Sequence, residues 1–97
     1  MSSSKQFKDF ILEQLRDLEN IDVRPMMGEF LLYYEGVLFG GIYDDRFLIK
    51  KTNSNKKYSL AEETPYEKAK PMYLIDNLDD TEYLRDLVKI TCKDIRQ

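Results

Sequence analysis

The chain has 97 residues, of which 42% are hydrophobic and 34% charged, and its formal net charge is −3. This length suits one domain, and the hydrophobic content is too high for an intrinsically disordered chain. The small net charge, with lysines and arginines dispersed among carboxylates, excludes a global field that would attract nucleic acid or an anionic membrane. We therefore expect residues 1–97 to form a single globular domain.

The cysteine content and the start of the chain bear on its location. Cys92 is the only cysteine, so no internal disulfide can form, and residues 1–5 lack the apolar run of a signal peptide. No stretch approaches the roughly 20 continuous apolar residues that span a bilayer. These features predict a cytoplasmic protein with no membrane contact.

The beginning of the chain has the spacing of an amphipathic helix. Apolar residues recur there at intervals of three and four, and Ser3 and Gln6 are placed to form a capping box. Pro25 then argues against a helix and suits an edge strand, because it has no backbone N–H to donate. We predict a helix over residues 5–19 and a first strand over residues 23–27.

Three segments rich in aromatic and branched residues follow, at residues 29–34, 37–43 and 46–51. Two residues separate each segment from the next, which is the length of a tight hairpin turn. Glu35-Gly36 and Asp44-Asp45 suit such turns, because Gly and Asp tolerate left-handed backbone angles. The three segments should therefore form an antiparallel β-meander.

Two-residue turns also fix the register of the meander. The expected cross-strand pairs are Tyr34 with Val37, Leu32 with Phe39, Tyr43 with Arg46, and Gly41 with Leu48. Both faces of this sheet carry apolar side chains, so neither face is expected to be fully solvated.

The second half of the chain is less regular. Residues 52–57 are polar and predict a mobile loop, followed by a short helix over residues 58–63. Residues 72–75 predict a last strand. Asp79 and Glu82 can cap a final helix, whose apolar stripe is Leu84, Leu87, Val88, Thr91 and Ile95. The predicted fold class is α+β, an antiparallel β-meander sheet with an N-terminal helix and a C-terminal helix packed on it.

Residues 26–40 and 44–50 resemble, in spacing and order, the N-terminal domain of the TfoX/Sxy family. Tyr66, Lys70-Pro71 and Tyr73 fall where that family has its aromatic segment, so the resemblance covers nearly the whole chain. The family commonly has Met-Phe-Gly-Gly where this chain has Met26-Met27-Gly28-Glu29, and its longer members carry a second, C-terminal domain. The resemblance implies a link to bacterial regulators of DNA-uptake competence, which promote transcription with partner proteins and have no known catalytic reaction.

The composition argues against an enzyme. The chain has no histidine, so Cys92 has no imidazole to activate it as a nucleophile. Cys92 falls near the apolar face of the last predicted helix, and we interpret it as a small buried hydrophobe. The carboxylate pairs Asp44-Asp45 and Asp79-Asp80 are explained by a turn and a helix start, with Mg²⁺ binding as a minor alternative. We expect no catalytic residue, no cofactor and no metal.

Gly40 and Gly41 interrupt a predicted strand. Glycine there costs stability, so the pair indicates a bulge or the close approach of a helix, another backbone or a ligand, with packing the favoured interpretation. The aromatic side chains nearby suit either the core or a surface that contacts a partner. The candidate partner-binding residues are Tyr33, Tyr34, Phe39, Gly40 and Gly41.

Lysines cluster around the end of the meander, next to Tyr58. They are the candidate nucleic-acid contacts, although solvated loop lysines are the simpler interpretation because the cluster lacks arginine and several exposed aromatic residues. These lysines are Lys50, Lys51, Lys56 and Lys57.

Each of the two apolar sheet faces must be shielded from water, and the chain supplies two helices that can pack on them. If both helices pack on one face, the other face is an exposed patch that favours a homodimer or a partner protein. If the helices divide between the faces, a monomer suffices. We therefore expect a non-enzymatic regulatory module that binds a protein partner or itself. The alternative is a nucleic-acid-binding module that uses the basic residues around 50–58.

Overall fold

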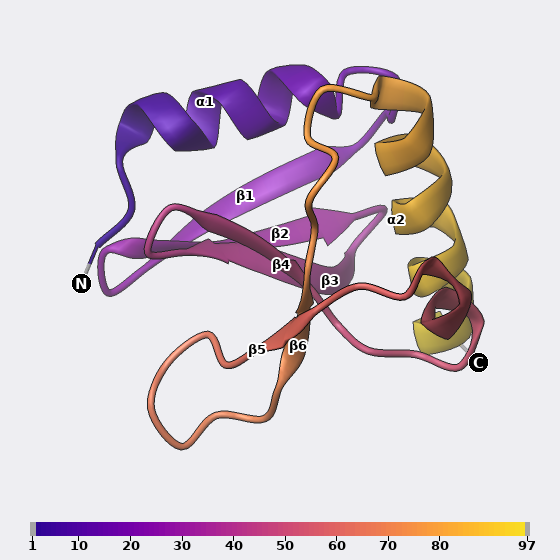
Figure 1. Ribbon diagram of the computed structural model, residues 1–97. Coiled ribbons are helices and arrows are strands. Elements are labelled where there is room, and N and C mark those ends of the chain that lie inside the picture. The colour runs from indigo at the N-terminus through magenta and orange to yellow at the C-terminus, as the bar shows by residue number, and fades with distance from the viewer. Residues whose placement is uncertain (1, 97) are drawn as a thin grey trace.

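A six-stranded antiparallel sheet lies at the centre of the computed structural model, which describes residues 2–96 (Figure 1). The elements in chain order are α1 (Lys5–Gln14), β1 (Ile21–Met26), β2 (Glu29–Tyr34), β3 (Val37–Tyr43), β4 (Arg46–Ile49), the 3₁₀ helix η1 (Ser54–Tyr58), β5 (Glu62–Glu63), β6 (Met72–Leu74) and α2 (Thr81–Arg96). The strand order is β1-β2-β3-β4-β6-β5. The predicted α+β class, with a helix at each end of the chain, is confirmed.

Three two-residue turns connect the first four strands. Both residues of each turn have positive φ, the pattern of the type I′ turns that match the twist of a hairpin. The turns are Met27 (51°) and Gly28 (87°), Glu35 (50°) and Gly36 (82°), and Asp44 (54°) and Asp45 (56°). The two turns predicted within the meander are confirmed, and the turn between β1 and β2 adds a third.

The register within the meander agrees with three of the four expected pairs. Tyr34 pairs with Val37 as expected, and the two β3–β4 pairs are also confirmed. Leu32, however, pairs with Gly40 and not with Phe39, because the β2–β3 register shifts between Leu32 and Tyr33. This β-bulge adds one residue to β3 and leaves the Phe39 ring fully buried in the core.

The glycines of β3 are explained by close packing. A Cβ atom on Gly40 would lie 2.3 Å from the backbone oxygen of Leu48 in β4. A Cβ atom on Gly41 would lie 2.7 Å from the backbone oxygen of Phe30 and equally close to the Tyr43 ring. Neither position has room for a side chain, so the packing interpretation accounts for both residues.

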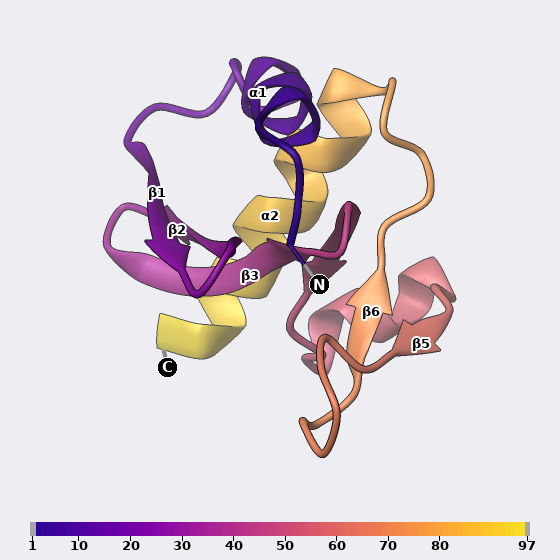
Figure 2. The same ribbon diagram turned by 90° about the vertical axis from the view of Figure 1, so that its left-hand side faces the viewer.

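Both helices contribute to one hydrophobic core, on one face of the sheet. Helix α1 runs along the sheet and α2 stands across its end (Figure 1). Figure 2 shows the same arrangement from the side. The buried core residues are Ile11, Leu15 and Leu18 from the first helix and its exit, Leu84, Leu87, Val88 and Cys92 from α2, and Leu32, Phe39, Ile42, Phe47 and Ile49 from the strands, with Leu60, Tyr73 and Ile75. Both helices therefore pack on the same face of the sheet, the first of the two arrangements considered from the sequence, and neither helix covers the other face.

Several predicted element boundaries are corrected. Helix α1 ends at Gln14, not at residue 19, and its N-cap is Ser4, whose Oγ accepts a 3.1 Å hydrogen bond from the Phe7 N–H. The cap of α2 is one residue later than predicted, because Asp80, and not Asp79, accepts from the Tyr83 N–H at 3.0 Å. The first strand begins at residue 21 and not at residue 23.

The segment between β4 and β6 differs most from the prediction. The helix expected over residues 58–63 is wrong, since η1 ends at Tyr58 and Glu62–Glu63 form β5. The loop expected to be mobile is attached to α2: the Ser54 N–H and Oγ donate to the Asp94 carboxylate at 2.8 and 2.9 Å. Its lysines therefore project from a fixed 3₁₀ turn.

Candidate binding surfaces on the helix-free face

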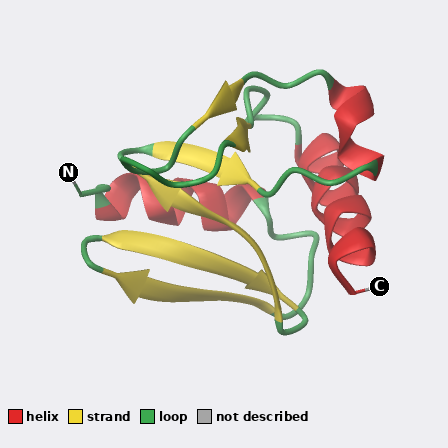
Figure 3. Ribbon diagram, turned by 90° about the horizontal axis from the view of Figure 1, so that it is seen from below, coloured by secondary structure: helices red, strands yellow, loops and turns green. Residues whose placement is uncertain are grey.

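We call the side of the sheet opposite the core the helix-free face. Because paired residues in antiparallel strands point to the same side, the pairs of Tyr33 with Leu38 and of Gly41 with Leu48 place these residues on it, together with Tyr43. Figure 3 looks onto this side, with α1 behind the strands. None of these residues belongs to the core shared by the two helices.

Residues 64–71 cover one half of this face. The rings of Tyr66 and Tyr43 lie with their centres 6.2 Å apart, and Tyr43 retains only 6% of its exposure. Leu48 is fully buried. Figure 1 shows the corresponding loop, between β5 and β6, on the side of the sheet away from α1. We call residues 64–71 the roof segment.

The other half of the helix-free face has no such cover, although Met26 at its border lines a hollow with Pro65 and Tyr66 of the roof segment. Met26, Leu31, Tyr33 and Leu38 are half-buried there, and we call these four residues the open patch. At the edge of the patch, the Arg24 guanidinium lies 5.0 Å from the centre of the Tyr33 ring. The open patch is therefore an apolar surface with a charged margin.

The five residues predicted to bind a partner do not share one surface. Tyr33 lies in the open patch, whereas Tyr34 packs against the core on the opposite face, beneath the Arg96 guanidinium at 5.8 Å. Phe39, Gly40 and Gly41 are buried. Sequence reasoning did not select Leu31 and Leu38 as contacts, although the two-residue alternation of the strands already placed them on the same side as Tyr33.

A pocket of about 660 Å³ lies between the roof segment and the sheet. Most of its lining residues are apolar or aromatic, three are lysines, and none is Asp or Glu. The lining residues are Leu38, Gly40, Tyr43, Lys50, Lys51, Pro65, Tyr66, Ala69, Lys70, Pro71 and Met72. We call this cavity the lysine pocket.

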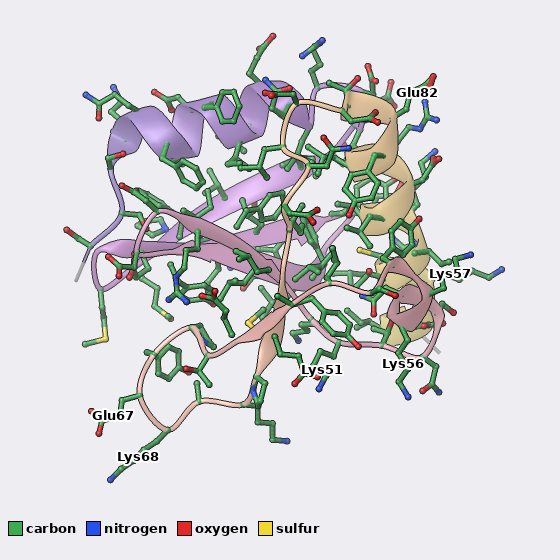
Figure 4. All side chains as sticks on the ribbon, in the orientation of Figure 1. Lys51, Lys56, Lys57, Glu67, Lys68 and Glu82 are labelled. Atoms are coloured by element: carbon green, nitrogen blue, oxygen red, sulfur yellow. The ribbon has the colours of Figure 1, made fainter. Side chains whose placement is uncertain are left out.

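The four lysines predicted as nucleic-acid contacts are divided between different surroundings. Lys50 and Lys51 line the lysine pocket, and the Lys51 ammonium also lies 2.9 Å from the Glu62 carboxylate. Lys51 also lines a second hollow together with Lys56 and Asp94, while Lys57 is exposed. Figure 4 shows Lys57 projecting away from Lys51. The structure therefore gives these lysines no shared, purely basic surface.

A polar cluster joins the N-terminal segment to two of the hairpin turns, the first through a 3.0 Å hydrogen bond from the Ser3 N–H to the Gly28 carbonyl. The Glu29 carboxylate accepts from Ser3 Oγ at 2.6 Å and from the Asp44 N–H at 3.1 Å. The Asp45 carboxylate accepts from the Ser4 N–H at 2.7 Å. These bonds stabilise two non-glycine residues with positive φ, so the acidic pair at this turn has a structural role.

Cys92 has the surroundings of an inert thiol. It is fully buried, and burial raises the pKa of its thiol to about 11, although the nearby Arg96 partly opposes this shift. The thiol is therefore protonated near neutral pH, and the prediction of a buried hydrophobe is confirmed. In residues 2–96 no group of three or more His, Cys, Asp or Glu side chains is arranged to hold a metal. No helix in that range combines the length and apolar character required to cross a membrane.

The fold and surfaces define a small α+β domain with one helix-covered and one helix-free sheet face. The TfoX N-terminal domain family matches residues 13–94, and the chain belongs to this family. A relative from Spirochaeta aurantia, named "Uncharacterized 12.7 kDa protein in trpE 5'region", is 26% identical over 94 residues. That match covers 94% of this chain and 82% of the relative. The family membership confirms the resemblance seen in the sequence.

Proposed function

We propose that this TfoX N-terminal domain is a non-enzymatic regulatory module that acts by binding protein through the open patch, with a second copy of the chain as the occupant. The observation that carries the proposal is the placement of both helices on one sheet face, which leaves Leu31, Tyr33 and Leu38 half-buried on the other. An apolar surface of this kind gains free energy when a partner removes it from water. The regulatory character follows the family, whose members include competence regulators.

The charges at the margin of the open patch suit a second copy. Asp22 and Arg24 both point to the helix-free face, and they form a 3.7 Å ion pair on β1. A two-fold axis brings the same patch of each copy together, so the surface must complement itself. An apolar centre with one carboxylate and one guanidinium beside it meets this requirement, because each charge can face its opposite in the other copy.

The edge of β1 favours contact through the face over pairing of strands. The Glu35 N–H donates to the Asn20 carbonyl at 3.1 Å, so Asn20 and Glu35 form a hydrogen-bonded pair. Hydrogen-bonded and non-hydrogen-bonded pairs alternate along antiparallel strands, so Ile21, Val23 and Pro25 all occupy non-hydrogen-bonded positions. The backbone groups of these three residues point away from β2. Pro25 has no N–H to offer a further strand, so a continuous edge-to-edge ladder is blocked there.

Sedimentation equilibrium over a wide range of protein concentration tests the proposal. The wild-type chain should show a reversible monomer–dimer equilibrium, and Leu31→Glu should shift it to monomer because a carboxylate would be buried in the interface. Phe10→Glu is the matched control, since Phe10 is 38% exposed on α1, on the other side of the sheet. Equal association of the two variants would contradict the proposed surface, and so would a wild-type chain that stays monomeric throughout.

A further inference from the structure

We propose that the lysine pocket binds a small amphipathic anion, a molecule with a flat apolar body and one anionic group such as a carboxylate. This proposal does not rest on the proposed self-association, although the pocket adjoins the open patch and Leu38 belongs to both. Its ligand class follows from the size, the walls and the charge of the cavity.

The size and walls of the pocket fit a small molecule. A volume of about 660 Å³ lies within the range of roughly 300–1,000 Å³ typical of small-molecule sites. Leu38 and Met72 extend from the strands, and Pro65, Ala69 and Pro71 belong to the roof segment. The Tyr66 ring, which is 59% exposed, adds flat aromatic surface against which a planar body can stack, whereas the Tyr43 ring is nearly buried.

The charge of the pocket selects an anion. Lys50, Lys51 and Lys70 line it without any carboxylate, in a chain whose net charge is −3. Within residues 2–96, Lys50 and Lys70 have no carboxylate within ion-pair distance, whereas Lys51 forms an ion pair with Glu62. An anion entering an apolar cavity needs such cations to compensate for its lost hydration.

The first residues of the roof segment are held in place by Arg46, so the pocket is formed in advance of binding. Arg46 forms a 2.6 Å ion pair with Glu63 and donates to the backbone oxygens of Thr64 and Pro65 at 3.2 and 3.3 Å. On the opposite wall, the Lys51 ammonium lies 5.6 Å from the centre of the Tyr73 ring. A preformed site saves the ligand the free energy of ordering the loop.

Fluorescence titration with anilinonaphthalenesulfonate, a planar aromatic anion, tests the proposal. We expect saturable binding at one site, weakened roughly tenfold in the double variant Lys50→Gln/Lys70→Gln. The double variant Lys56→Gln/Lys57→Gln removes the same charge outside the pocket and should bind as the wild type does. The uncharged analogue phenylnaphthylamine should bind more weakly, with an affinity that the Lys50→Gln/Lys70→Gln change leaves unaltered.

Two further variants separate the pocket from other apolar surfaces. Ala69→Leu reduces the free volume without changing charge, so both probes should bind more weakly to it. Leu31→Glu should leave probe binding intact even if it abolishes self-association, so the two proposals can fail independently. Thermal unfolding confirms that each variant is folded. Unchanged sulfonate affinity in Lys50→Gln/Lys70→Gln, or equal affinity for the charged and uncharged probes, would overturn the proposal.

Discussion

The buried side chain of Asn55 donates a 2.9 Å hydrogen bond from Nδ2 to Oγ1 of Thr91, and this bond fixes η1 to α2. The same Nδ2 donates to the Lys50 carbonyl at 2.8 Å, and Oδ1 accepts from the Thr52 N–H at 2.9 Å. These bonds satisfy the asparagine amide without water. The segment that leaves β4 beside the lysine pocket is thereby held in place.

Replacing Asn55 should destabilise the domain strongly. Asn55→Leu leaves the Lys50 carbonyl, the Thr52 N–H and the Thr91 hydroxyl without this partner, and we expect a loss of about 3 kcal/mol in the free energy of unfolding. Urea denaturation measures it. Asn53→Ala alters an exposed neighbour and should change stability by less than about 0.5 kcal/mol. Similar stabilities for the two variants would contradict the role assigned to Asn55.

Glycine substitutions distinguish steric packing from backbone conformation. Gly40→Ala places a methyl group 2.3 Å from a backbone oxygen of β4, so β3 and β4 must separate, with an expected cost of more than about 3 kcal/mol. In Gly36→Ala the new methyl group meets no atom within 4 Å, so the free energy of unfolding should fall only through the strain of an alanine at positive φ, by about 1–2 kcal/mol. Thermal unfolding of both variants measures the difference. The packing account fails if Gly36→Ala is the more damaging change.

The contact between Asp94 and η1 should make stability depend on pH. The Ser54 backbone N–H, and then its hydroxyl, lower the pKa of the Asp94 carboxyl below its ordinary value of 3.8. The stabilisation is therefore present above about pH 3.8 and disappears as the pH falls through the lowered pKa. Asp94→Asn should be less stable than the wild type at neutral pH, and this gap should narrow in acid. A gap independent of pH in urea titrations would refute the ionic contribution.

The thiol of Cys92 should be unreactive in the folded chain. Burial removes access to it and raises its pKa to about 11, so little thiolate exists near neutral pH. Reaction with Ellman's reagent should be slow in buffer and fast in denaturing urea. A fast reaction of the native chain would show that the last turns of α2 open readily.

The sequence predicted the meander well because its determinants are local. Runs of aromatic and branched residues and two-residue turns define β2, β3 and the start of β4, and a turn such as Glu35-Gly36 fixes the nearest cross-strand pair. The bulge at Phe39 could not be predicted in this way. It is a shift in the pairing of β2 with β3 between Leu32 and Tyr33, and turn length alone does not reveal such a shift.

The rest of the differences also arise from long-range contacts. The position of η1 depends on Asn55 and Asp94, whose partners lie up to 40 residues away in the chain. The lysine pocket requires the roof segment to fold over β3, so Lys70 could not be associated with Lys50 from sequence spacing. The open patch was within reach of prediction, because the alternation of side chains along a strand places Leu31 and Tyr33 together.

The central claim, self-association through the open patch, is tested most directly by amide nuclear magnetic resonance spectra recorded over a dilution series. We predict concentration-dependent shifts at Leu31, Tyr33 and Leu38 and at the neighbouring Arg24, with the amides of α1 and α2 unchanged. Shifts confined to the helices, or spectra that do not change with concentration, would contradict it.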